Sequence, residues 1–176
     1  MKDQSYERYS IRLNLNHEIN KWFKFGLQTQ YSHSVKERGS GMESDAYMYR
    51  ISPLGALRNE DGTPTQLVAS DAQMWNPLMN LEKGAVSAPE KVSRYLGSYY
   101  IEVTFPVEGL KFKSNLGLDA RTKQDYQFYS SNTSTRQLGT SYAYNGMSKY
   151  TMMTLENMLF YNRDFGKDHT VGVTLL

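Results

Sequence analysis

The sequence predicts an all-β fold, an antiparallel meander of about six long strands with two long loops, built as a transmembrane β-barrel. Three observations support this expectation. Polar and apolar residues alternate along several stretches, these stretches run to about 10–15 residues against about 5–6 in globular sheets, and short and long connections alternate. Bacterial outer-membrane barrels have short periplasmic turns and long extracellular loops, so the alternation of short and long connections favours such a barrel.

The composition excludes several classes of protein. The chain has 176 residues, a net charge of +2 and no cysteine, so we expect no nucleic-acid partner, no disulfide framework and no thiolate metal site. No apolar run approaches the roughly 18 residues of a transmembrane helix. The first residues, MKDQSYERYS, lack the apolar segment of a signal peptide, so we expect a cytoplasmic chain or an internal piece of a longer one.

The first half of the chain predicts two strands and then a long loop. One strand covers residues 6–16, the polar segment HEINK (17–21) forms a turn, and a second strand runs from Phe23 to about Val35. Residues 36–92 lose the alternation and contain the turn-forming strings RGSG, NEDGTP, WNPL and KGAVSAPE, so we expect a loop there.

The second half repeats this arrangement. Residues 93–105 and 110–121 alternate again on either side of the tight turn PVEG (106–109). A polar stretch over 124–149 predicts the second long loop. Residues 150–165 indicate a strand, with a helix as the alternative because both faces are mixed, and TVGVTLL at the end predicts a further strand after a turn around Gly166.

Over residues 9–16, 23–35, 93–105 and 110–121, the apolar register of the expected strands contains no charged residue, as a lipid-facing surface requires. A soluble protein core would require the same, so a soluble β-sandwich or adhesin-like binding module stays open as the alternative; loop asymmetry and strand length favour the barrel. In the barrel, one set of residues faces lipid and another faces the lumen. The first set is Leu13, Phe25, Leu27, Leu116 and Leu118, and the second is Arg12, Gln28, Lys113 and Asp119.

Aromatic residues next to the short turns are candidates for a membrane-interface girdle. Trp22 and Phe23 follow the first turn and Phe105 precedes the second, where amphipathic rings would lie at the level of the lipid headgroups. Packing in a hydrophobic core at the strand ends is the alternative.

Aromatic residues in the expected loops are candidates for contact with a ligand or partner. Trp75, beside Asn76 and Pro77, could stack on a sugar or touch a partner protein, or it could anchor its own loop. For Tyr126 and Tyr129 in the other loop the same two alternatives apply: contact with a ligand or partner, or anchoring of the loop.

No catalytic or metal-binding pattern is recognisable. The three histidines, His17, His33 and His169, lack the spacing of metal ligands, and Asp61 in NEDGT fits a β-turn better than a calcium loop. The sequence contains neither a nucleophile elbow nor a phosphate-binding glycine loop. We therefore expect no enzymatic activity, no metal and no cofactor.

Taken in order, four segments carry a family resemblance. They are RYSIRLNLNHEINKWFKFGLQTQYSHS, the loop strings NEDGTP and WNPL, RYLGSYYIEVTFPVEGLKFKSNLGLD, and TLENMLFYNRDFGKDHTVGV. Their order and spacing resemble the barrel of SusC/RagA-type TonB-dependent transporters of Bacteroidetes along almost the whole chain.

The resemblance implies a large outer-membrane β-barrel with a plug, a TonB complex that supplies energy, a SusD-like surface lipoprotein, and a glycan or peptide substrate. Residues 1–176 would then be a partial barrel, and the plug, the TonB box and the remaining strands would be absent. Residues 36–92 and 124–149 would lie outside the cell. The turns at 17–21, 106–109 and 163–168 would lie in the periplasm.

Overall fold

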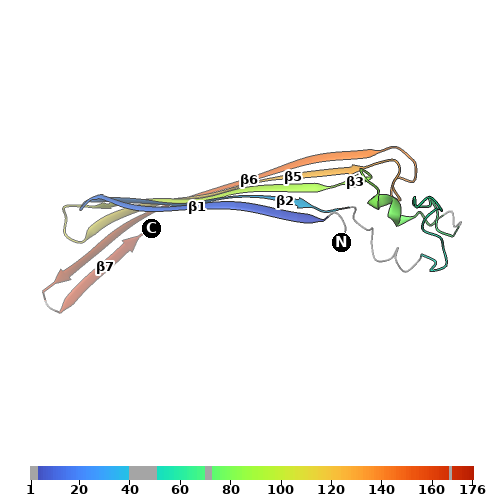
Figure 1. Cartoon of the computed structure of the whole chain (residues 1–176). Coiled ribbons are helices and arrows are strands. Elements are labelled where there is room, and N and C mark those ends of the chain that lie inside the picture. The colour runs from blue at the N-terminus through green and yellow to red at the C-terminus, as the bar shows by residue number, and fades with distance from the viewer. Residues whose placement is uncertain (1–3, 40–50, 70–72, 167) are drawn as a thin grey trace. The chain divides into compact units, whose positions relative to one another are not determined.

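The computed structural model describes residues 4–39, 51–69, 73–166 and 168–176. These residues form an antiparallel sheet of seven strands in the order β1-β2-β4-β5-β6-β7, with β3 paired to β5 (Figure 1). The strands are β1 (Ser5–Asn20), β2 (Phe23–Glu37), β3 (Val86–Ser87), β4 (Pro89–Thr104), β5 (Leu110–Tyr129), β6 (Tyr142–Phe165) and β7 (His169–Leu175). A short 3-10 helix, η1, covers Pro77–Leu81. The predicted meander of long strands is confirmed.

The turn predicted at residues 17–21 is wrong, because β1 continues to Asn20. The Asn20 side chain makes the turn: its Oδ1 accepts hydrogen bonds from the backbone N–H of Trp22 at 2.8 Å and of Phe23 at 3.0 Å. The segment 17–20 stays in the strand because its polar side chains find partners across the hairpin. Glu18 pairs with Lys24 at 3.0 Å, for example.

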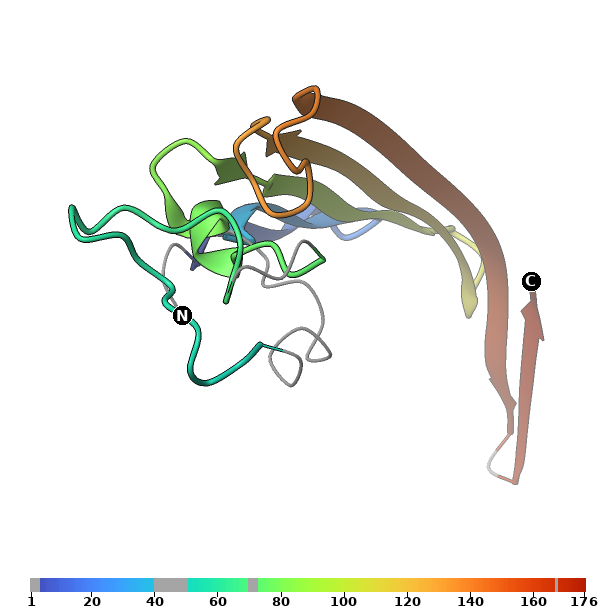
Figure 2. The same cartoon turned by 90° about the vertical axis from the view of Figure 1, so that its right-hand side faces the viewer.

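Both long loops are shorter than predicted. Strand β5 runs on to Tyr129 and β6 already begins at Tyr142, so the second loop covers only 130–141 rather than 124–149. The region 36–92 likewise ends in strands, since β3 and β4 begin at Val86 and Pro89. Residues 150–165 lie within β6, which removes the helical alternative. Figure 2 shows β6 turning into β7 as a hairpin.

The chain divides into two compact units. The first consists of residues 1–7, 34–92 and 123–148, and the second of residues 8–33, 93–122 and 149–176. Every buried apolar side chain among the described residues belongs to the first unit; they are Val68, Met79, Ala85 and Ala88. This unit contains both long connections and η1, so the small protein core of the chain lies among its loops.

Two buried asparagines hold the loops of the first unit. The Asn76 side chain is fully buried; it caps η1 by accepting from the Leu78 N–H at 3.0 Å and donates to the Leu57 carbonyl at 2.7 Å. Asn80 Oδ1 accepts from the backbone N–H of Ser134 at 2.9 Å and from its hydroxyl at 3.1 Å. The Asn80–Ser134 contact therefore ties the two long loops together, although 54 residues separate them.

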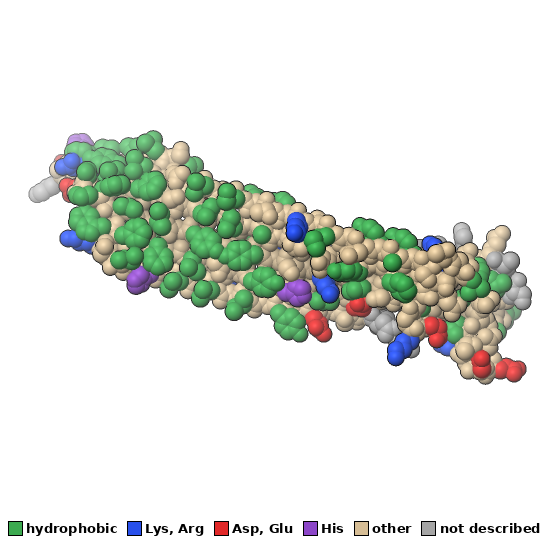
Figure 3. Space-filling view, turned by 90° about the horizontal axis from the view of Figure 1, so that it is seen from above, with side chains coloured by type: hydrophobic (Ala, Val, Ile, Leu, Met, Phe, Trp, Pro, Cys, Tyr) green, Lys and Arg blue, Asp and Glu red, His purple; other side chains and the backbone are tan. Residues whose placement is uncertain are grey.

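The second unit is a single-layered sheet. None of its described apolar side chains is buried, and large ones are wide open, with Ile11 and Met153 each 70% exposed. Figure 3 views the face on which hydrophobic side chains gather over the strands. No described residue belongs to a helix long and apolar enough to span a membrane. Within the described chain, the apolar register of this unit has no protein layer over it.

One close approach fixes the register on the other face of the second unit. The ring of Tyr100 on β4 lies over Gly26 on β2, and its hydroxyl donates to Asn16 Oδ1 on β1 at 3.0 Å. The Lys113 ammonium on β5 lies 5.0 Å from the centre of the same ring. Only glycine leaves room for the ring at position 26, because a Cβ there would clash with Tyr100 and lie 2.5 Å from Asn16 Oδ1.

We predict that Gly26→Ala destabilises the protein by about 1–3 kcal/mol, because the added methyl displaces the Tyr100 ring. Unfolding by denaturant measures this. Gly117→Ala is the matched control, since a Cβ at position 117 meets Thr154 only at 3.7 Å, an ordinary contact. Equal stability of both variants would contradict the packing described for Tyr100.

We further predict that Asn80→Ala loosens the second loop, because the buried Ser134 N–H loses its acceptor at a cost of about 1–3 kcal/mol. Hydrogen exchange in a peptide covering 130–141 should then be about tenfold faster or more. Asn20→Ala is the control, because Asn20 belongs to the second unit and its side chain bonds the neighbouring backbone of Trp22 and Phe23. Unchanged exchange in Asn80→Ala would show that the loops are not held by this contact.

Candidate functional site

A network of polar side chains covers one face of the sheet in the second unit. Arg94 on β4 forms two hydrogen bonds to the Asp119 carboxylate on β5, at 2.9 and 2.7 Å. Ser98 on β4 donates to Asn115 Oδ1 on β5 at 3.2 Å, and Asn115 donates to Glu156 on β6 at 3.4 Å. These pairs use alternate residues of each strand, so they all lie on one face.

The residues predicted to line a lumen lie on this polar face. Arg12 donates to Gln30 at 2.7 Å, and Lys113 and Asp119 contact Tyr100 and Arg94. Because strand residues alternate, the apolar register lies on the opposite face. On that opposite face the rings of His17 on β1 and Phe25 on β2 lie 5.6 Å apart, centre to centre.

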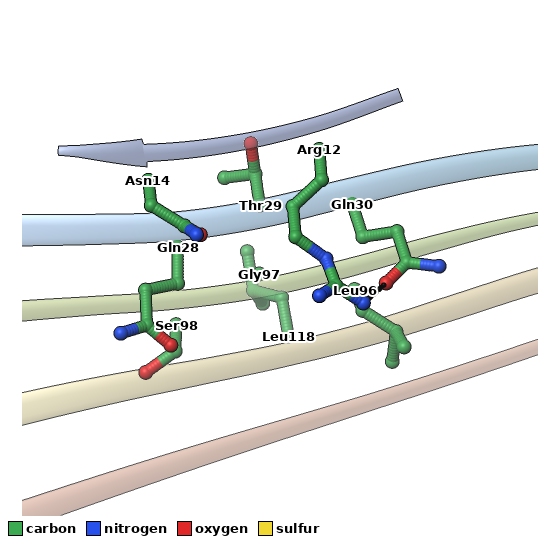
Figure 4. Close-up of a pocket in the computed structure, with 9 residues that line it drawn as sticks. All are labelled: Arg12, Asn14, Gln28, Thr29, Gln30, Leu96, Gly97, Ser98 and Leu118. Carbon is green, nitrogen blue, oxygen red and sulfur yellow. Dashed lines mark hydrogen bonds between the residues drawn. The ribbon is translucent and has the colours of Figure 1, made fainter. Parts of the chain in front are cut away.

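The polar face contains an open pocket of about 320 Å³ lined by residues of β1, β2, β4 and β5 (Figure 4). Its lining consists of Arg12, Asn14, Gln28, Thr29, Gln30, Leu96, Gly97, Ser98 and Leu118. In Figure 4 the guanidinium of Arg12 lies beside the Gln30 amide, and the Gln28 amide lies beside Ser98. The pocket therefore presents hydrogen-bonding groups and one positive charge.

The aromatic residues predicted for ligand contact do not come together in one site. Tyr126 and Tyr129 lie in β5 rather than in a loop, and their three-residue spacing puts them on opposite faces. Tyr126 lines an open pocket of about 620 Å³, with the Lys91 ammonium 5.7 Å from its ring centre. Tyr129 lies 6.1 Å from Tyr142, ring centre to ring centre. Ligand contact by either residue stays a prediction.

Trp75 lies in the first loop, half-buried, and forms an isolated antiparallel bridge with Leu67. The residue after it is the buried cap of η1, so the segment around Trp75 is held by backbone and cap hydrogen bonds. Its predicted role in binding a ligand or partner is untested.

The three predicted girdle aromatics lie beside short turns. Trp22 is in the β1–β2 turn and 41% exposed, with the Lys21 ammonium 5.1 Å from its ring. Phe23 begins β2, half-buried, and Phe105 follows β4 and is 38% exposed. They are amphipathic or apolar groups left open at strand ends, and the lipid interface remains their predicted environment.

Asp61 in the first loop behaves as a turn residue. Its carboxylate accepts from the Thr63 hydroxyl at 2.6 Å and from the Thr63 N–H at 2.9 Å. These bonds lower the pKa of Asp61. No group of three His, Asp or Glu side chains in the described part of the chain could hold a metal ion.

Sequence reasoning missed the side chains that organise each unit. Asn16, Gly26 and Tyr100 meet across three strands, and Asn80 meets Ser134 across two loops. Gly26 within an alternating strand was the available signal, since such a glycine indicates a close approach by another group.

No family model matches the chain. It is 29% identical over 176 residues to TonB-dependent receptor P3 of Formosa agariphila, in an alignment that covers 93% of this chain and 17% of the receptor. The chain thus spans about a sixth of that relative's length.

The fold also has a solved counterpart. The structure of the RagAB peptide importer in the closed-closed state matches with a TM-score of 0.59 and 17% identity, over 96% of this chain and 19% of the matched chain. At 17% identity this structural likeness establishes the fold alone. The sequence match is a separate indication that the chain is similar to TonB-dependent receptors. In sequence and in fold, the chain resembles a stretch of the β-barrel of SusC/RagA-type TonB-dependent transporters.

Proposed function

We propose that this chain forms part of the barrel wall of an outer-membrane, TonB-dependent importer. The main observation behind this proposal is the single-layered sheet of the second unit. Within the described residues no protein layer covers its apolar register, and its other face is covered by a polar network. Outer-membrane barrels need such a wall, apolar toward lipid and polar toward the lumen. The resemblance to a TonB-dependent receptor and to an importer supports the same assignment.

The orientation follows from the two kinds of connection. The short turns at Lys21–Trp22, 105–109 and around Gly166 would lie in the periplasm, and the loops of the first unit outside the cell. In this arrangement Trp22, Phe23 and Phe105 lie at the periplasmic lipid interface.

The partners and the cargo belong to the longer protein. We propose outer-membrane lipid, a SusD-like lipoprotein and the TonB complex as partners, and a peptide or a glycan as the cargo. The solved relative is described as a peptide importer, which supports the first kind of cargo. Both relatives are named for reception or import, which agrees with a protein that is not an enzyme.

A soluble β-sandwich or adhesin-like module is less well supported. A sandwich buries one face of each sheet against a second sheet. The described residues of the second unit form one layer, and their apolar side chains are open instead (Figure 3).

Epitope tags test the proposed orientation. Tags inserted at Gly62 and at Thr140 should bind antibody on intact cells, because both positions lie in exposed loop segments of the first unit. Tags at Lys21 and at Glu108 should bind only after the outer membrane is permeabilised. The opposite accessibility would contradict the proposal, as would antibody binding at all four sites on intact cells.

A further inference from the structure

The pocket on the polar face has the chemistry of an anion site. Arg12 reaches into it from β1 and donates to Gln30 Oε1 at 2.7 Å, which holds the guanidinium in place while leaving most of its N–H groups free (Figure 4). The side-chain amides of Asn14 and Gln28 line the same pocket and bond to no side chain that the structure describes. An amide NH₂ and a guanidinium are both donors to an oxyanion.

The charge of Arg12 is not neutralised within the described residues. Two other cations on this face have carboxylate partners, Lys24 with Glu18 at 3.0 Å and Arg94 with Asp119 at 2.7 Å, whereas Lys113 lies over the Tyr100 ring. Arg12 forms no such ion pair, and no Asp or Glu is among the described residues that line its pocket. Its partner is a neutral amide, so a positive charge stays available to a ligand.

We propose that this pocket binds carboxylate groups of the cargo, so that the imported solute is acidic. The inference rests on the proposed importer function and names a class of cargo for it. The planar fork of a guanidinium matches the two oxygens of a carboxylate, and the Asn14 and Gln28 amides line the same pocket as further donors to an acidic cargo. The Leu96 side chain lines the same pocket and adds an apolar surface beside these polar groups.

A carboxylate could come from an acidic peptide or from an acidic sugar, and two probes distinguish these sources. Fluorescent tetraglutamate and fluorescent tetragalacturonate are titrated into the purified full-length protein in detergent, at physiological salt, with tetraglutamine as the neutral control. Fluorescence anisotropy gives each dissociation constant. At least one acidic probe should bind clearly more tightly than tetraglutamine.

Variants locate the binding. Arg12→Gln should weaken binding of the acidic probe about tenfold, because a charge-assisted contact is lost. Arg12→Lys should recover part of it, since lysine keeps the charge without the fork. Arg94→Gln is the matched control: it removes the same charge from the same face, but that guanidinium is already occupied by Asp119, so binding should change by less than about twofold.

The outcomes separate this inference from the proposed function. Binding of both acidic probes no tighter than tetraglutamine, or equal losses in Arg12→Gln and Arg94→Gln, would overturn the acidic-cargo site. The tag experiment above would still support the importer in that case. Gln30→Leu keeps the charge and removes the hydrogen bond that orients Arg12, so it should also weaken binding; unchanged binding in this variant and in Arg12→Lys would show that the pocket geometry is irrelevant.

Discussion

The uncovered apolar register of the second unit is the constraint on which the rest of the molecule depends. Side chains such as Ile11, Leu13 and Leu155 are more than half exposed, at 70%, 58% and 62%. Large contiguous apolar surfaces are rare on soluble monomers and mark an interface with another protein or with a membrane. A bilayer would supply the apolar surroundings that the described chain does not, and it would need no interlocking partner side chains.

Because lipid would not distinguish one strand register from another, the polar face has to determine the register of the strands. A register slip by one residue would send every apolar side chain to the polar side, so the strands need anchors that distinguish the two faces. The polar network provides these anchors. Pairs such as Arg94 with Asp119 form in one register alone, and the Tyr100 ring fits over position 26 because the residue there is glycine. In the same network Arg12 on β1 donates to the neutral amide of Gln30 on β2, so no carboxylate among the described residues neutralises its charge.

Sequence alternation predicted the strands well only where the two faces differ in polarity. It ended β5 too early and began β6 too late, because residues 122–129 and 142–149 carry polar and aromatic side chains on both faces, while the backbone ladder continues. It read the polar segment 17–20 as a turn, although cross-strand pairing such as Glu18 with Lys24 keeps it in β1. Pairs that join distant segments, Asn80 with Ser134 above all, depend on loop packing and leave no local pattern.

Cysteine labelling tests the central claim that the apolar register faces lipid and the polar register faces water. Single cysteines replace Leu27 and Leu116 on one register, and Gln28 and Lys113 on the other; this chain has no cysteine of its own. The full-length protein in lipid vesicles is treated with a membrane-impermeant maleimide. The account predicts rapid labelling at 28 and 113 and little at 27 and 116, whereas labelling at 27 and 116 with protection at 28 and 113 would contradict it.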